Sequence, residues 1–215
     1  MLPFTVDEFF AVFARYNQAI WPAQVVAYVL AVVTLGLVLL RPGDASGRVV
    51  STILALLWLW TGVAYHAIHF APINPAAWLF AVVFMGQGLL LLREGAWRGR
   101  LRFAPARGPE AAFGWLLAGY ATVLYPLVGA WTGHVFPEAP TFGVTPCPVT
   151  LFSVGLLLLT SRPVPGVLLV VPASWSMIGG SAAFLLRVPQ DWMLLVGGLA
   201  GIAAIVIRDR ASGAK

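Results

Sequence analysis

Long apolar stretches recur along the chain at nearly regular intervals. Seven can be drawn, and they cover residues 20–40, 49–70, 75–92, 112–131, 146–160, 166–186 and 191–207. Each is long enough, or nearly so, to cross a hydrocarbon core of about 30 Å as an α-helix. The fifth is the weakest, because it spans only if the stretch from Gly143 to Pro148 also enters the membrane. The pattern predicts an all-α, polytopic transmembrane helix bundle with seven spans.

A separate amphipathic element precedes the first span. Thr5 and Glu8 occupy the two positions of a capping box, and Phe4 and Phe9 occupy those of a hydrophobic staple. Apolar residues then follow at helical spacing. We therefore expect residues 1–19 to form a helix at the outer interface. Such a helix either lies on the membrane surface or forms a lid over an outward-facing pocket.

The basic residues predict the orientation of the bundle. If the N-terminus is outside, only Arg15 and Arg187 lie outside with it, and the other eleven of the thirteen basic residues lie inside. Because positive charge favours the cytoplasmic side, this split predicts an N-out, C-in protein. We expect a single integral membrane domain over residues 1–215, with the bundle at 20–207 and a cytoplasmic tail at 208–215. The expected location is the bacterial cell (inner) membrane, as a multi-pass protein.

Composition agrees with a lipid environment. Of the 215 residues, 60% are apolar and 10% are charged, and the mean hydropathy is +0.88. A soluble domain is about 45–50% apolar and about 25% charged. The net charge of +5 does not indicate nucleic-acid binding, because the basic residues lie at the ends of apolar runs. Five arginines in the loop from Arg93 to Arg107 instead predict contact with anionic lipid. A membrane-protein partner or a homo-oligomer is a further expectation.

The three histidines are all predicted on the outer side. His66 and His69 lie near the outer end of the second span, at a spacing that shares one face of an α-helix, and His134 follows the fourth span. Two imidazoles and a third ligand are the minimum for a zinc or copper site with an open position, and haem is a further alternative. A polar pocket without a metal ion is the competing interpretation. The candidate site residues are Tyr65, Glu138 and Thr145 for a ligand and His66, His69, His134 and Cys147 for a metal ion.

The single cysteine, Cys147, stands between two prolines. It has no partner for an intrachain disulfide. Pro148 suits the first turn of a helix, which places Cys147 at the N-cap, where the helix dipole favours a thiolate. The alternative is a small buried apolar residue at a broken helix.

The chain contains the short motifs Phe4-Thr5, Tyr16-Asn17, Trp21-Pro22, Tyr65-His66, His69-Phe70, Asn74-Pro75 and the segment from Phe142 to Pro148. Together these motifs resemble a bacterial membrane-protein family known only as a domain of unknown function. The resemblance covers nearly the whole chain. It implies a small polytopic membrane protein and does not imply a particular activity.

The topology is also similar to that of seven-helix membrane hydrolases such as alkaline ceramidases, although their His-x-x-x-His motif near the last span is absent here.

These observations favour a membrane protein with an outward-facing pocket, lined by histidine and cysteine, that binds or moves a small ligand or metal ion. One alternative is a metal-dependent membrane enzyme, hydrolase-like, with Glu138 as general base. Another is a structural subunit of a larger membrane complex. The chain has no phosphate-binding loop, and its only lysine is Lys215, outside every span. Nucleotide hydrolysis and a retinal Schiff base are therefore excluded.

Overall fold

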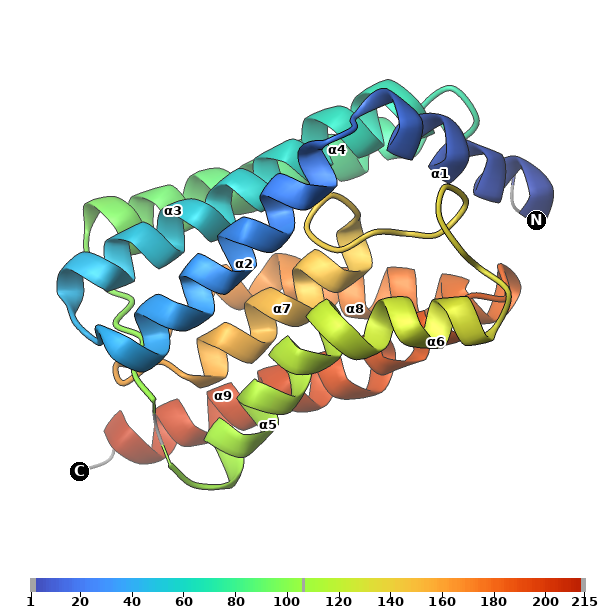
Figure 1. Cartoon of the computed structure of the whole chain (residues 1–215). Coiled ribbons are helices and arrows are strands. Elements are labelled where there is room, and N and C mark those ends of the chain that lie inside the picture. Colours follow the sequence, from blue (N-terminus) through green and yellow to red (C-terminus); the bar gives the residue numbers. More distant parts are fainter. Residues whose placement is uncertain (1–2, 106, 214–215) are drawn as a thin grey trace.

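The computed structural model describes residues 3–105 and 107–213, which form a bundle of helices (Figure 1). Within these residues there is no strand, and one isolated bridge joins Phe103 to Thr160. The predicted all-α class is confirmed. The first half contains α1 (Val6–Ala19), α2 (Ala23–Leu40), α3 (Asp44–Trp60), the π-helix η1 (Thr61–Phe70), α4 (Ala77–Leu91) and the π-helix η2 (Leu92–Trp97). The second half contains α5 (Pro109–Gly119), η3 (Tyr120–Leu124), α6 (Tyr125–Trp131), α7 (Pro146–Leu158), α8 (Val167–Leu185), η4 (Pro189–Asp191), η5 (Leu194–Gly198) and α9 (Leu199–Gly213).

Among the described residues, six helices are long and apolar enough to cross a membrane. They follow six of the seven apolar segments of the sequence closely. Two of them are α2 and α8, and each of the other four joins consecutive helical elements without a break. Their bounds are Ala23–Leu40, Asp44–Phe70, Ala77–Trp97, Pro109–Trp131, Val167–Leu185 and Pro189–Ala211. The remaining segment forms α7, which is apolar but has only 13 residues.

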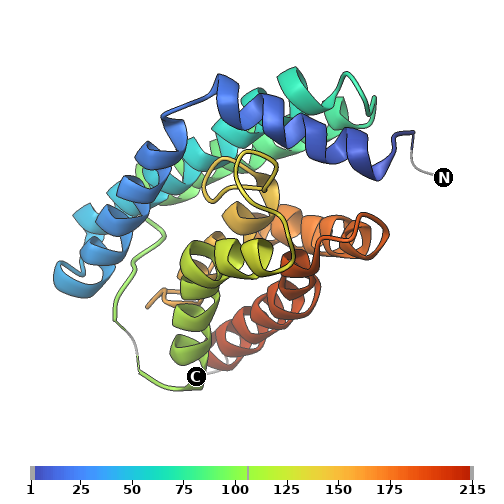
Figure 2. The ribbon, with the colours of Figure 1, turned by 45° about the vertical axis from the view of Figure 1, so that its right-hand side comes forward.

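Helix α7 occupies the centre of the bundle. All 13 of its residues are buried, and Figure 2 shows α1–α4 on one side of it and α5, α6, α8 and α9 on the other. Its closest neighbour is α5, where two glycines face each other. A Cβ on Gly155 would lie 2.8 Å from the carbonyl oxygen of Gly114, so only glycine permits this approach.

The segment before α7 is buried as well. Thirteen helical residues extend about 20 Å, which is shorter than a hydrocarbon core of about 30 Å. The chain from Phe142 to Thr145 is buried inside the protein just before the helix begins. Helix α1 contacts this irregular segment. The Tyr16 hydroxyl donates to the carbonyl of Val144 (2.7 Å).

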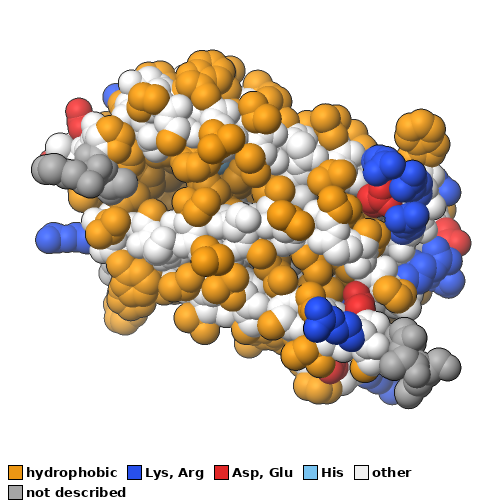
Figure 3. Space-filling view, turned by 180° about the vertical axis from the view of Figure 1, so that it is seen from behind, with side chains coloured by type: hydrophobic (Ala, Val, Ile, Leu, Met, Phe, Trp, Pro, Cys, Tyr) orange, Lys and Arg blue, Asp and Glu red, His pale blue; other side chains and the backbone are white. Residues whose placement is uncertain are grey.

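The chain ends and the charged side chains distinguish the two ends of the bundle. The N-terminus and residues 71–76, 132–145 and 186–190 lie at one end, which we call the α1 end, and the C-terminus lies at the other (Figure 1). At that other end, the arginine-rich end, the buried carboxylate of Glu94 pairs with Arg93 (3.1 Å), Arg98 (3.0 Å) and Arg100 (2.8 Å). Figure 3 shows arginine side chains gathered there, beyond a long apolar surface. Ala106 of the basic loop, residues 1–2 and residues 214–215 lie outside the described residues.

Helix α1 begins as its sequence predicts. The amide of Glu8 donates to the Thr5 hydroxyl oxygen (3.2 Å), and the amide of Thr5 donates to the Glu8 carboxylate (2.8 Å). This backbone hydrogen bond, with a second one from the Thr5 hydroxyl, lowers the pKa of Glu8. The rings of Phe4 and Phe9 stack at 6.0 Å across the cap, as a hydrophobic staple requires. Both predicted features are confirmed.

Candidate functional site

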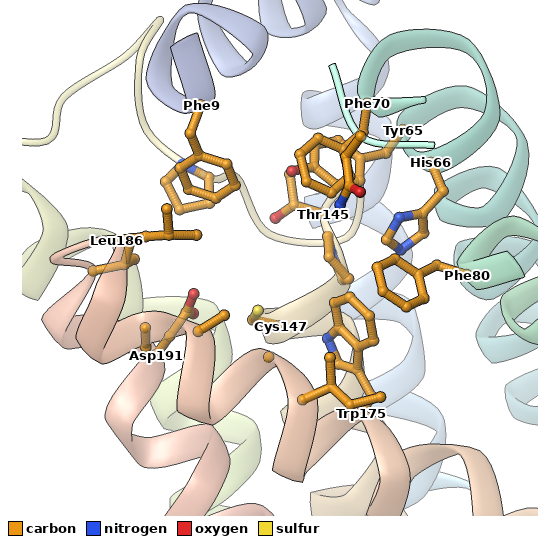
Figure 4. Close-up of a pocket in the computed structure, with 18 of the residues that line it drawn as sticks. Phe9, Tyr65, His66, Phe70, Phe80, Thr145, Cys147, Trp175, Leu186 and Asp191 are labelled. Atoms are coloured by element: carbon orange, nitrogen blue, oxygen red, sulfur yellow. The ribbon is translucent and has the colours of Figure 1, made fainter. Parts of the chain in front are cut away.

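A cavity of about 140 Å³ lies inside the α1 end of the bundle. Its walls come from α1, η1, α4, α8, the start of α7 with the segment before it, and the turn that joins α8 to η4 (Figure 4). Most of the lining is apolar, aromatic rings are prominent in it, and the polar groups are few. Small-molecule sites commonly have this composition, an apolar wall with a small number of converging polar groups. The labelled polar side chains in Figure 4 are Tyr65, His66, Thr145, Cys147, Trp175 and Asp191.

His66 lines this cavity from the π-helix η1. Its side chain is fully buried, and neither ring nitrogen has a hydrogen-bond partner among the described residues. The imidazole lies among aromatic rings, with centroids 4.6 Å from Phe84, 5.2 Å from Trp175 and 5.7 Å from Phe80. An unpaired buried polar group is costly, which makes His66 the most conspicuous candidate for a ligand contact.

Asp191 is the only acidic residue among the described residues that line the cavity. It ends the short 3-10 helix η4 and is 6% exposed. The hydroxyl of Tyr125 donates to its Oδ1 (2.5 Å), and the thiol of Cys147 is a second hydrogen-bonding neighbour. The cavity lining contains no lysine or arginine. The carboxyl group is therefore buried and held in position by neutral donors alone.

Helix α1 covers the cavity and is tied to the elements around it. Phe9 and Phe13 line the cavity from this helix. The ring of Phe13 stacks on Tyr65 at 5.4 Å. The Asn17 amide donates to the carbonyls of Pro137 (2.7 Å) and Ala139 (2.8 Å) in the segment before α7. Of the two expectations for this helix, the geometry favours the lid.

Tyr16 ties α1 to the segment before α7. Besides donating to the carbonyl of Val144, its hydroxyl accepts a hydrogen bond from the indole N–H of Trp60 (3.0 Å). Burial raises the pKa of Tyr16, so its hydroxyl remains a donor at physiological pH. The contact between α1 and the segment before α7 is thus insensitive to ordinary changes of pH.

The predicted metal ligands do not come together. Across residues 3–105 and 107–213, no three histidine, cysteine, aspartate or glutamate side chains are grouped so as to hold a metal ion. His66 and Cys147 line the cavity, whereas His69 and His134 do not. The Nδ1 of His69 bonds instead to the carbonyl of Ala64 (2.8 Å). The π-helix explains the separation of His66 from His69, because its wider turn removes the shared face that an α-helical i,i+3 pair would have.

His134 and Glu138 lie together in a different, shallow pocket near the surface. The imidazole of His134 stacks on Phe10 at 4.3 Å, and its Nδ1 lies 3.3 Å from the hydroxyl of Thr132. Partial burial lowers the pKa of His134, although the charge of Glu138 acts in the opposite direction. This pocket is on the outer face of α1, so neither residue faces the cavity.

Besides His66, three of the predicted site residues line the cavity, and for one of them, Cys147, the predicted position in its helix is wrong. Tyr65 and Thr145, both named as ligand-binding candidates, are in the lining with Cys147. The prediction that Cys147 is the N-cap of its helix is wrong, because α7 begins at Pro146 and its N-cap is Thr145. Pro146, two residues before Pro148, occupies the first helical position, which also suits a proline. Cys147 therefore lies within the first turn and is buried.

The sequence analysis missed Asp191 and Trp175. Asp191 stands at the start of an apolar segment, where a charged residue normally marks the membrane boundary. Trp175 lies in the middle of an apolar run, where a large ring is expected in any case. The sequence feature that could have indicated Asp191 is the pair Gln190-Asp191, in which two polar residues adjoin an apolar helix. Both residues are buried.

The fold and the cavity define a class of protein: an all-helical bundle, with six helices apolar enough to cross a membrane, that encloses a small aromatic cavity beneath its first helix. The chain belongs to the family described as "Family of unknown function (DUF6064)", whose model matches residues 6–215. The resemblance to a family of unknown function is thereby confirmed. No curated protein and no solved structure matches the chain.

Proposed function

We propose that this chain is a polytopic membrane protein that binds a small organic ligand in the cavity beneath α1, with α1 as its lid. The observation that carries the proposal is His66, a fully buried imidazole that has no hydrogen-bond partner among the described residues and lines a mainly apolar cavity rich in aromatic rings. Ionisable groups within membrane-spanning segments are costly and usually mark functional sites. The cavity volume of about 140 Å³ is similar to that of a cavity of roughly 150 Å³ that admits benzene. A ligand of that size fits without movement of the helices.

The proposal does not include a metal ion, because the side chains expected to bind one lie apart. His66 and Cys147 line the cavity, His134 lines the shallow pocket, and His69 lines neither. A hydrolase-like mechanism with Glu138 as general base loses its support for the same reason. Glu138 lies in the shallow pocket, outside the cavity that contains His66.

We also propose seven spans in a bacterial inner membrane, with the α1 end outside. Support comes from α7 and the segment before it, which enters from the α1 end (Figure 1). The helix reaches the arginine-rich end, where the amide of Ala104 donates to the carbonyl of Leu159 (3.0 Å). The arginines gathered at that second end favour the cytoplasmic side. Each of the three arginines around Glu94 keeps 42–54% of its side chain exposed, which supports contact with anionic lipid headgroups. A membrane-protein partner or second copy stays a prediction.

Cysteine labelling on intact cells tests the orientation. In a Cys147→Ser background, Ala45→Cys places an exposed thiol at the arginine-rich end and Ala76→Cys places one at the α1 end. An impermeant thiol reagent should label only the second in sealed cells and both after lysis. Labelling of Ala45→Cys in sealed cells would contradict the orientation.

The native Cys147 tests the covered cavity. Because it is the only cysteine and lines the cavity, its modification reports access to the site. A small impermeant thiol reagent applied to sealed cells should label wild-type Cys147 slowly and denatured protein at once. Phe9→Ala removes a ring between α1 and the cavity and should accelerate labelling.

Phe10→Ala is the matched control. Phe10 is the adjacent residue on the same helix, but it stacks on His134 and does not line the cavity. It should leave the labelling rate near that of wild type. If Cys147 reacts equally in wild type, Phe9→Ala and Phe10→Ala, α1 is not a lid. If it reacts in none of them, the cavity is not reached from outside.

A further inference from the structure

We propose, resting on the ligand-binding function above, that the cavity selects a small organic ammonium ion that carries an oxygen atom at its other end, as an amino alcohol does. The inference comes from the two opposed sets of polar groups in the cavity. Figure 4 shows Asp191 on one side and His66 with Trp175 on the other, with aromatic rings around the space between them.

The acidic side of the cavity favours a cationic ligand. Asp191 is 6% exposed, and no lysine or arginine lines the cavity to neutralise it. A buried carboxylate without a counter-ion is strongly unfavourable. The hydrogen bond from the Tyr125 hydroxyl (2.5 Å) holds the carboxyl group in position at the edge of the cavity. A cationic ligand supplies the missing counter-charge.

The wall between the two sides suits an organic cation better than a bare metal ion. Phe9, Phe13, Tyr65, Phe70, Phe80 and Trp175 all contribute to the lining. Aromatic faces attract ammonium groups, and quaternary ammonium ligands are commonly recognised by such cages. These rings offer no ligand atoms to a metal ion, and metal ions generally require several donor atoms. Contact with these rings instead buries the hydrocarbon part of an organic cation, which favours its binding.

The opposite side calls for an oxygen atom. Both ring nitrogens of His66 are buried without hydrogen-bond partners among the described residues. The buried indole Nε1 of Trp175 has the thiol of Cys147 as its hydrogen-bonding neighbour, and a sulfur atom is a weak acceptor. A neutral imidazole has one donor and one acceptor, and an indole has one donor. A hydroxyl group donates and accepts, so it satisfies both rings. The cavity therefore matches a molecule with a cationic end and a hydroxyl end.

Protection of Cys147 by three probes tests this assignment in the detergent-purified full-length protein. The probes are choline, its uncharged carbon isostere 3,3-dimethylbutan-1-ol, and tetramethylammonium, which lacks the oxygen. Choline should protect Cys147 from a neutral thiol reagent at about tenfold lower concentration than the isostere, as expected for a desolvated cation–π and ion-pair contact. Tetramethylammonium should be intermediate.

Two variants assign the two ends of the ligand. Asp191→Asn keeps the side-chain shape and should abolish the preference for choline over the uncharged isostere. His66→Phe should abolish the preference for choline over tetramethylammonium. A shift of Tm by each probe gives a second readout that does not depend on Cys147 or on the variants.

Equal protection and equal Tm shifts by choline and its isostere would overturn the inference, and so would the absence of both effects with all three probes. Either result leaves the covered cavity standing if Cys147 still reacts from outside in a Phe9-dependent manner. Failure of that labelling pattern would count against the proposed function itself, whatever the probes do.

Discussion

Replacement of His66 by phenylalanine should stabilise the protein. The substitution keeps an aromatic ring among Phe80, Phe84 and Trp175 but removes two buried nitrogens that have no protein partner. Each unsatisfied buried polar group costs about 1–3 kcal/mol. The slightly larger ring also extends into the cavity of about 140 Å³ rather than into packed side chains. We expect the free energy of unfolding to rise by about 2 kcal/mol.

Thermal unfolding in detergent, followed by tryptophan fluorescence, measures this effect. For a chain of this size, about 1 kcal/mol corresponds to about 2–4 °C in Tm, so His66→Phe should raise Tm by about 4–8 °C. His69→Phe is the control, because the Nδ1 of His69 does bond to the carbonyl of Ala64 (2.8 Å). Loss of that hydrogen bond should lower the free energy of unfolding by about 1 kcal/mol. The two neighbouring substitutions therefore have opposite expected signs.

A fall in Tm for His66→Phe would refute the reasoning, because it would show that the imidazole makes a stabilising hydrogen bond. A rise in Tm combined with a loss of ligand recognition would show instead that stability is given up at this position for function.

Three further substitutions test the fold. Thr5→Ala should cost about 1 kcal/mol through loss of the cap and speed amide exchange at residues 7–10; unchanged exchange would show that the cap is not used. Gly155→Ala places a Cβ 2.8 Å from backbone atoms of α5 and should lower Tm, whereas Gly119→Ala meets nothing within 4 Å and should not. Glu94→Gln should destabilise the arginine-rich end by about 2 kcal/mol in thermal unfolding, since its carboxylate is 2% exposed and pairs with three arginines. The exposed Glu110→Gln is its control, and equal Tm values for the two variants would contradict this role for Glu94.

The elements of this protein follow from local features of the sequence. Apolar runs long enough for a bilayer gave the positions of all the long helices, because a buried or lipid-facing helix must be apolar along its length. The start of α1 was predicted from the spacing of Thr5 and Glu8 alone, since a capping box involves only neighbouring residues. Tyr65, His66, Thr145 and Cys147 were also singled out as polar residues within or beside apolar segments, and all four line the cavity.

What those side chains meet was decided by the tertiary structure. The sequence treats residues 61–70 as ordinary helix, whereas the π-helical turn of η1 directs His66 into the cavity and leaves His69 bonded to its own backbone. From the sequence alone, Asp191 is interpreted as a residue at the membrane boundary. The packing of η4 in the folded protein buries it beside Tyr125 of α6 and Cys147 of α7. The hydrophobic pattern of the sequence indicates which residues lie within long apolar helices. It does not record the winding of a helix or the partners across the bundle, and these determine the chemistry of the cavity.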